Sequence, residues 1–249
     1  MERSNEQKIV ILGAGQAAGT AVVTLRQMGH AGPITLVGDE DAPPYQRPPL
    51  SKAYFKGELP EARLYVKPEG YYGDQNVTMK LGESAVSLDR AAKTVTLSGG
   101  EVLPYDKLII ATGSRPRVIP VAGADLDGVM VLRTLADVDA MAPAVVEGAS
   151  ALIVGGGYIG LEAAAVCAKR GVKVTLVEMA DRILQRVAAP ETSDYFRALH
   201  SSHGVDIREG VGLERLTGAD GKVTGAVLSD GSELEVDFVV VGVGIAPAT

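Results

Sequence analysis

Residues 151–178 constrain the fold more than any other part of the chain. They begin with a short apolar run, which is typical of a parallel strand that is buried on both faces. Gly155, Gly157 and Gly160 follow with the spacing G-x-G-x-x-G. The first glycine of this pattern permits a tight turn, and the second lets a pyrophosphate approach the backbone. The pattern predicts that a helix begins there with its free N–H groups directed at the phosphates.

A second strand and an acidic residue complete this unit. Residues 161–170 are good helix formers, Gly171 is a natural stop, and residues 172–177 are rich in β-branched side chains. The strand ends in Glu178, 23 residues after Gly155, about where a carboxylate accepts both hydroxyls of an adenine ribose. A glycine-rich turn that serves packing alone is the alternative. The ordered strand, glycines, helix, strand and acid favour nucleotide binding instead.

The composition is that of a globular protein with well-developed cores. The chain has 249 residues, 46% of them hydrophobic, which is enough for one large or two modest domains. Its 24 basic and 31 acidic residues give a net charge of −7 without a basic block. We therefore expect no binding to nucleic acid or to an anionic membrane.

The chain ends and the cysteine content indicate a cytoplasmic protein without a metal site. The first eight residues are polar, and the apolar run at 238–248 is too short to span a bilayer. Cys167 is the single cysteine, which excludes an internal disulfide and a cysteine metal cluster. The three histidines are dispersed without the spacing of metal ligands.

The first forty residues repeat the organisation of residues 151–178. An apolar strand is predicted at 8–12, followed by Gly13 and Gly15, with Ala18 at the place of the third glycine. A helix at 17–28 and a strand at 34–37 complete the repeat. The two copies differ at the end of the second strand, because Gly38 stands where Glu178 stands in the other copy.

Both halves continue in the same way, so the chain is an internal duplication. Hairpins are predicted at 94–105 and at 223–236, and each precedes an apolar strand and a glycine turn. We predict an α/β fold with two Rossmann-like dinucleotide-binding domains, each a parallel sheet with an antiparallel β excursion.

A proline-rich segment at 41–52 is predicted to be a stiff loop, since its four prolines exclude a helix interior or a central strand. Such a loop either connects elements only or holds Arg47 and Lys52 over a bound phosphate or ring. The residue pattern favours neither reading. Further along, Thr134 and Asp137 have the spacing of a helix N-cap and its partner.

Several motifs together resemble a known family. The sequences YDKLIIATG and VGVGIAPAT, with the two glycine patterns, are similar to two-dinucleotide flavoprotein reductases of the glutathione-reductase-like fold. The segments LVGDEDAPPYQRPPLSKAY, LRTLAD, GGGYIGLEAAA and RILQRVAAPETS resemble ferredoxin reductases that serve bacterial oxygenases, the putidaredoxin and rhodocoxin reductase group. The resemblance covers residues 8–249 almost continuously. It implies FAD in the first half and NADH in the second.

The resemblance also implies domain limits and site residues. It divides the chain into residues 1–113 (the N-terminal part of the FAD domain), 114–244 (the NAD domain) and 245–249 (the start of the return to the FAD domain). The residues implied at FAD are Gly13, Ala14, Gly15, Gln16, Ala17, Asp39, Arg47, Lys52, Ala85, Thr112, Gly113 and Arg133. Those implied at NADH are Gly155, Gly157, Tyr158, Ile159, Gly160, Glu162, Glu178, Arg186, Gly242 and Gly244.

The implied activity is electron transfer from NADH through FAD to a small iron–sulfur ferredoxin. Lys52 and Glu162 form the expected electrostatic pair beside the reacting rings. Family members continue beyond the point matching residue 249 with a segment that completes the FAD domain, so we expect the first half alone to hold FAD poorly. Two alternatives stay open: a disulfide reductase, which needs a cysteine pair, and a nucleotide-binding fragment without turnover.

Overall fold

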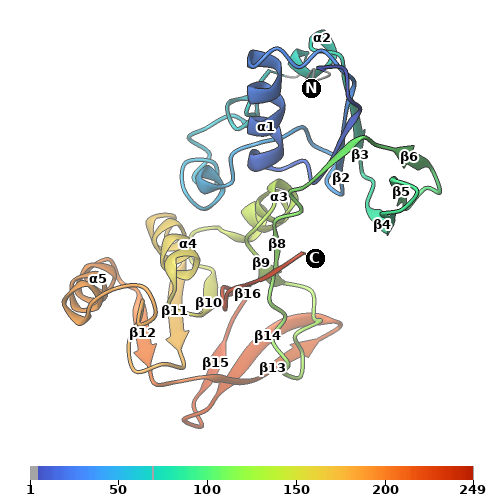
Figure 1. The fold of residues 1–249 in the computed structure, drawn as a ribbon. Coiled ribbons are helices and arrows are strands. Elements are labelled where there is room, and N and C mark those ends of the chain that lie inside the picture. Colours follow the sequence, from blue (N-terminus) through green and yellow to red (C-terminus); the bar gives the residue numbers. More distant parts are fainter. Residues whose placement is uncertain (1–4, 69, 249) are drawn as a thin grey trace. The chain divides into compact units, whose positions relative to one another are not determined.

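The computed structural model describes residues 5–68 and 70–248, and it contains two compact units (Figure 1). The first unit takes residues from 1–47, 60–114 and 247–249. The second takes Pro48–Leu59 and Arg115–Ala246. The end of the proline-rich loop thus belongs to the second unit. Residues 48–59 were predicted in the first domain but lie in the second unit; the predicted domain limits and the assignment of FAD and NAD to the two parts stay predictions.

The first unit is built on a four-stranded parallel sheet in the order β3-β2-β1-β7. Its parallel strands are β1 (Ile9–Leu12), β2 (Ile34–Gly38), β3 (Val77–Leu81) and β7 (Lys107–Ile110). An antiparallel sheet holds β4 (Ala85–Asp89), β5 (Thr94–Leu97) and β6 (Val102–Pro104). The helices are α1 (Gln16–Gln27) and α2 (Tyr71–Asp74), with a 3₁₀ turn η2 (Glu61–Arg63).

Strand β1 shows how the first unit forms its core. All four of its residues are buried, and they alternate between the two faces of the sheet. Ile11 packs with Val22 of α1 on one face. Val10 packs with Val95 of the antiparallel sheet on the other. The parallel sheet therefore lies between a helix and the antiparallel excursion.

The second unit has a five-stranded parallel sheet in the order β12-β11-β10-β16-β9. Its parallel strands are β9 (Val129–Val131), β10 (Ser150–Val154), β11 (Lys173–Glu178), β12 (Asp206–Glu209) and β16 (Phe238–Val241). Its helices are α3 (Leu135–Met141), α4 (Tyr158–Lys169) and α5 (Pro190–Ser202), with 3₁₀ turns η1 (Pro48–Ser51) and η3 (Ala142–Ala144). An antiparallel sheet holds β13 (Leu213–Ala219), β14 (Lys222–Leu228) and β15 (Glu233–Glu235).

The layers of the second unit repeat those of the first. Leu152 and Val154 of β10 pack with Leu228 of the antiparallel sheet. Helix α4 packs against β10 and β11. The short strands β8 (Ser114–Pro116) and β17 (Ile245–Pro247) pair where the chain passes from one unit into the other. The predicted fold class, two Rossmann-like units with antiparallel excursions, is confirmed.

The two parallel sheets differ at their closing strands. Strand β16 is flanked by β10 and β9, and all its residues are buried. Strand β7, its counterpart, is an edge of the first sheet in the described part of the chain. Ile110 at the end of β7 is 61% exposed, whereas Val241 at the equivalent position of β16 is 6% exposed.

Two elements depart from the sequence-based expectations. The proline-rich loop contains the 3₁₀ turn η1, in which Leu50 and Ser51 are buried. The sequence did not predict β13, of which Leu216 alone is buried, so that its apolar alternation is too weak to recognise. The predicted cap of α3 is confirmed, since Thr134 and Asp137 form a capping box.

None of the helices in residues 5–68 and 70–248 is long and apolar enough to cross a bilayer. In the same residues, no group of three His, Cys, Asp or Glu side chains is arranged to hold a metal ion.

Candidate functional site

The turn between β10 and α4 is so tightly packed that only glycine fits two of its positions. Gly155 has a φ of +107°, and a methyl group built on it would lie 2.6 Å from the carbonyl oxygen of Gly242. A methyl group on Gly160 would lie 2.0 Å from the carbonyl oxygen of Gly155. The turn therefore holds the start of α4 directly against the ends of β10 and β16.

Gly157 has the opposite surroundings and opens the turn to a ligand. It is the N-cap of α4, and no side chain caps the helix there. A methyl group built on Gly157 would meet no atom within 4 Å. The first N–H groups of an α-helix have no partner inside the helix and attract anions. An uncapped helix start with open space above its glycine fits a phosphate group of a nucleotide.

Both oxygens of the Glu178 carboxylate accept backbone hydrogen bonds. Oε2 accepts from the N–H of Gly156 at 2.7 Å, and Oε1 accepts from the N–H of Ala180 at 2.8 Å. These bonds fix the carboxylate at the end of β11, beside the glycine turn. Each carboxylate oxygen has a further lone pair, which a ribose hydroxyl can use.

The first unit builds its turn in the same way. Gly13 has a φ of +106°, and a methyl group on it would lie 2.1 Å from the carbonyl oxygen of Ala111. Gly15 is the N-cap of α1, without a side-chain cap and with no atom within 4 Å of an added methyl group. Ala18 stands fully buried where the second turn has Gly160. This turn also fits a phosphate group.

Beside the first turn there is no equivalent of Glu178. Gly38 ends β2, and a methyl group on it would lie 2.3 Å from Cβ of Ala14. Asp39, the residue predicted near the ribose, is exposed. Arg47, predicted to face FAD, forms an ion pair with Glu40 and donates a hydrogen bond of 3.0 Å to the hydroxyl of Tyr45.

The predicted pair Lys52 and Glu162 is in contact within the second unit. Nζ of Lys52 lies 2.8 Å from Oε2 of Glu162, and the side chains are 51% and 27% exposed. Ser51 donates a hydrogen bond from its hydroxyl to the same carboxylate oxygen. Ser51 is only 1% exposed, because η1 packs against α3 and α4. The carboxylate is thus held by one buried hydroxyl and one exposed cation.

The remaining predicted residues lie on several elements. Tyr158 and Ile159, at the start of α4, are 58% and 39% exposed. Gly242 packs on the second turn, and Arg186 reaches Gly244. Ala85, Thr112 and Gly113 are exposed parts of the first unit, whereas Arg133 is in the second, directly before the cap of α3. Contacts of these residues with a bound nucleotide stay predictions.

Sequence reasoning missed two residues of this site. Ser51 contacts Glu162, which is 111 residues away, and only its place beside Lys52 in the proline-rich loop could have suggested it. Gly156 binds Glu178, and a methyl group on it would lie 2.6 Å from Cγ2 of Ile183. The run of three glycines at 155–157 was the sequence signal that position 156 also has to be glycine.

Cys167 is confirmed as a buried core residue. It lies within α4 with 0% of its surface exposed. Burial raises the pKa of the Cys167 thiol to about 12, so the reactive thiolate is scarce at neutral pH. The thiol therefore has neither the access nor the ionisation that electron transfer through a disulfide requires.

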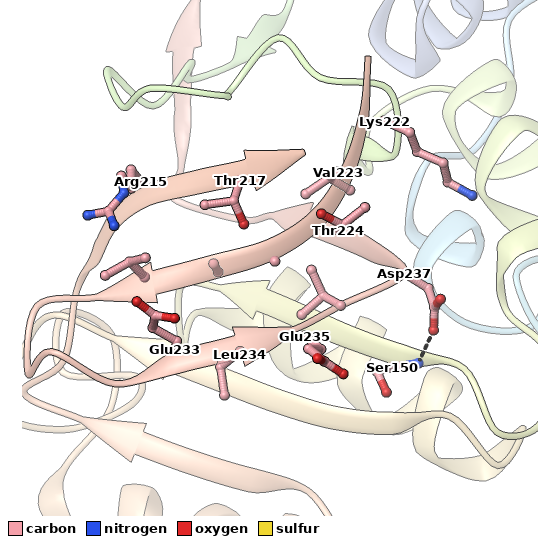
Figure 2. Close-up of a pocket in the computed structure, with 14 residues that line it drawn as sticks. Ser150, Arg215, Thr217, Lys222, Val223, Thr224, Glu233, Leu234, Glu235 and Asp237 are labelled. Atoms are coloured by element: carbon pink, nitrogen blue, oxygen red, sulfur yellow. Dashed lines mark hydrogen bonds between the residues drawn. The ribbon is translucent and has the colours of Figure 1, made fainter. Parts of the chain in front are cut away.

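A separate cavity of about 760 Å³ lies on the antiparallel part of the second unit. Figure 2 shows that its labelled side chains carry both charges, with Arg215 and Lys222 on β13 and β14 and Glu233 and Glu235 on β15. The N–H of Ser150 donates to Asp237 at 2.8 Å at one end. None of the predicted site residues lines this cavity, and its mixed charges do not converge on one point.

Comparisons with known proteins find reductases that match most of this chain. The chain is 42% identical to rhodocoxin reductase of Rhodococcus erythropolis over 239 residues, which is 96% of this chain and 56% of that protein. It is 39% identical to putidaredoxin reductase CamA of Pseudomonas putida, over 96% of this chain and 58% of that protein. The chain thus spans less than two thirds of the length of these relatives.

A solved structure and a family model extend these likenesses. The reductase in the crystal structure of the covalent putidaredoxin reductase–putidaredoxin complex matches with a TM-score of 0.93 and 38% identity, over 97% of this chain and 59% of that one. The model of the pyridine nucleotide-disulphide oxidoreductase family matches residues 7–249. Because this match covers nearly the whole sequence, the chain belongs to the pyridine nucleotide-disulphide oxidoreductase family.

Proposed function

We propose that this chain carries the nucleotide-binding part of a cytoplasmic ferredoxin reductase that passes electrons from NADH through FAD to a small iron–sulfur ferredoxin serving an oxygenase. The observation that carries the proposal is the second glycine turn, where an uncapped helix start adjoins a carboxylate fixed for a ribose. The likeness to rhodocoxin and putidaredoxin reductases supports the acceptor class.

In this proposal the second unit binds NADH through α4 and Glu178. The free N–H groups at the start of α4 bind the pyrophosphate, and Glu178 accepts hydrogen bonds from the adenine ribose. A 2′-phosphate would face the Glu178 carboxylate as a like charge, which favours NADH over NADPH. The flanking Tyr158 is exposed and free to pack against the nicotinamide.

The first unit binds FAD through the turn that contains Gly13 and Gly15. A bound flavin accepts electrons as a pair and releases them singly, which suits an iron–sulfur acceptor. The chain itself binds and orients the two nucleotides. Lys52 and Glu162 supply opposite charges beside the reacting rings, and Ser51 keeps the carboxylate in place.

The test is electron transfer by the purified chain from NADH to an artificial acceptor such as ferricyanide, with and without added FAD. The proposal predicts that NADH oxidation requires FAD and that NADPH oxidation is much slower. It also predicts that the protein shows a flavin absorption spectrum after it has been loaded with FAD. NADH binding without any turnover in the presence of FAD would instead favour a nucleotide-binding fragment.

The chain spans 56–59% of the length of the compared reductases, so turnover by this chain is itself part of the proposal. Lack of NADH binding would contradict both candidates. A disulfide reductase is disfavoured, because Cys167 is the single cysteine of the sequence and is buried.

A further inference from the structure

Two arginine side chains of the second unit converge on Gly244. Gly244 follows β16 and has a φ of +105°. A methyl group built on Gly244 would lie 3.7 Å from Nη2 of Arg186 and 3.9 Å from Nε of Arg117. Arg186 comes from the loop after β11, and Arg117 comes directly after β8. Two cations from distant parts of the chain thus reach the same point.

Arg117 is held in place by the backbone around this point. Its N–H donates to the carbonyl oxygen of Gly244 at 3.0 Å, and its Nε donates to the carbonyl oxygen of Ile245 at 3.0 Å. Both bonds leave the two terminal nitrogens of the guanidinium group available. A fixed guanidinium with free terminal donors is suited to binding a planar or tetrahedral anion.

In the part of the chain that the structure describes, no carboxylate pairs with either arginine. Within the described residues, neither Arg117 nor Arg186 forms an ion pair, and both side chains are exposed. Like charges directed at one point repel each other, and a bound anion removes that repulsion. The arrangement therefore favours the binding of an anionic ligand in the space beside Gly244.

Gly244 adjoins the second glycine turn through Gly242. The N–H of Gly242 donates to the carbonyl oxygen of Val154 at 2.8 Å, and the carbonyl oxygen of Gly242 faces Gly155. Gly244, which the arginines approach, thus lies at the carboxyl edge of the parallel sheet, two residues after the glycine that packs on the turn before α4. Open α/β sheets bind their ligands at this edge.

We infer that Arg117 is a further nucleotide-binding residue, which contacts a phosphate group of the dinucleotide together with Arg186. This inference rests on the proposed NADH site of the second unit. It adds a residue that no motif in the sequence pointed to. Arg117 follows β8 and lies 127 positions before Gly244 in the chain.

The test is NADH binding to the full chain, measured by titration calorimetry for the wild type, Arg117→Gln, Arg117→Lys and Arg170→Gln. Arg170→Gln is the matched control, because Arg170 is an exposed arginine of the second unit at the opposite end of α4. We expect the Kd for NADH to rise about 10- to 100-fold in Arg117→Gln and less in Arg117→Lys, with no change in Arg170→Gln. The weakening should shrink at high salt.

The outcomes separate this inference from the proposed function. Equal NADH affinity of Arg117→Gln and wild type would overturn the inference and leave the NADH site standing. No NADH binding by the wild type would overturn both. Equal losses in Arg117→Gln and Arg117→Lys, with an equally lowered Tm, would assign Arg117 a structural role through Ile245 and would also overturn the inference.

Discussion

The two glycine turns of this chain have the same backbone but opposite distributions of side chains. Gly13 and Gly155 share the same left-handed φ, and both helices start uncapped. In the first turn Ala14 carries a methyl group and Gly38 carries none. In the second turn the equivalent of Ala14 is Gly156, and the equivalent of Gly38 is Glu178.

Space explains this exchange. Cβ of a residue at position 38 would lie 2.3 Å from Cβ of Ala14, and Cβ of a residue at position 156 would lie 3.1 Å from Cβ of Glu178. The first turn therefore has no room for both side chains of the pair, whereas in the second turn the pair would be tight and a side chain at position 156 would chiefly clash with Cγ2 of Ile183, at 2.6 Å. In the second turn this space holds the carboxylate of Glu178. The two turns therefore share one backbone conformation but differ in whether a carboxylate is available to bind a ribose.

The largest expected effect is that of Gly160→Ala in the second turn. Its methyl group would lie 2.0 Å from a backbone oxygen, which cannot move aside as a side chain would. We expect a loss of about 3 kcal/mol in the free energy of unfolding, measured by urea denaturation. The matched change Ala18→Gly should cost only about 1 kcal/mol, as glycine in a helix does. Equal small losses would mean that the two helices pack alike on their turns.

The second prediction concerns the carboxylate that the first turn lacks. Glu178→Ala should weaken NADH binding about 10- to 100-fold and lower the ratio of NADH to NADPH affinity, because hydrogen bonds to a charged group contribute ~1.5–3 kcal/mol. Glu178→Gln separates the ribose contact from the bonds to Gly156 and Ala180, since an amide still accepts one of them. Asp39→Ala, at the exposed acid of the first unit, is the control and should leave NADH binding unchanged. An unaltered ratio in Glu178→Ala would show that Glu178 does not face the ribose.

The third prediction tests the exchange of side chains directly. Gly38→Ala should destabilise the first unit by about 2 kcal/mol, because the new methyl group overlaps that of Ala14. Adding Ala14→Gly should restore at least half of the loss, as measured by thermal unfolding of the double variant. Strict additivity of the two single changes would contradict the steric explanation.

The smallest effect is expected for the ion pair of Lys52 with Glu162. Both side chains are partly exposed, so the coupling energy should be about 0.5–1 kcal/mol in a double-mutant cycle on the free energy of unfolding. The pair of Arg47 with Glu40, in the first unit, provides the comparison and should couple more strongly, since both side chains are 25% exposed. If Lys52→Ala and Glu162→Ala lose stability additively, the contact has no energetic role.

The sequence by itself determined the duplicated fold and the two turns. Apolar strands, the glycine spacing and helix-forming residues act over neighbouring positions, and the backbone conformations that they require are local. For the same reason the cap at Thr134 and the burial of Cys167 followed from the pattern alone. The weakly patterned β13 did not, because its pairing partner rather than its own residues makes it a strand.

The tertiary structure alone decided which distant side chains meet. The contact of Ser51 with Glu162 spans 111 residues, and that of Arg117 with Ile245 spans 128. No local pattern contains such pairs, because they depend on how the strands order themselves in the sheets. The same holds for the assignment of Pro48–Leu59 to the second unit and for the hydrogen bond from Gly156 to Glu178, which spans 22 residues. Local sequence determines the conformation of each turn, whereas the packing of elements far apart in the chain decides which side chains meet beside it.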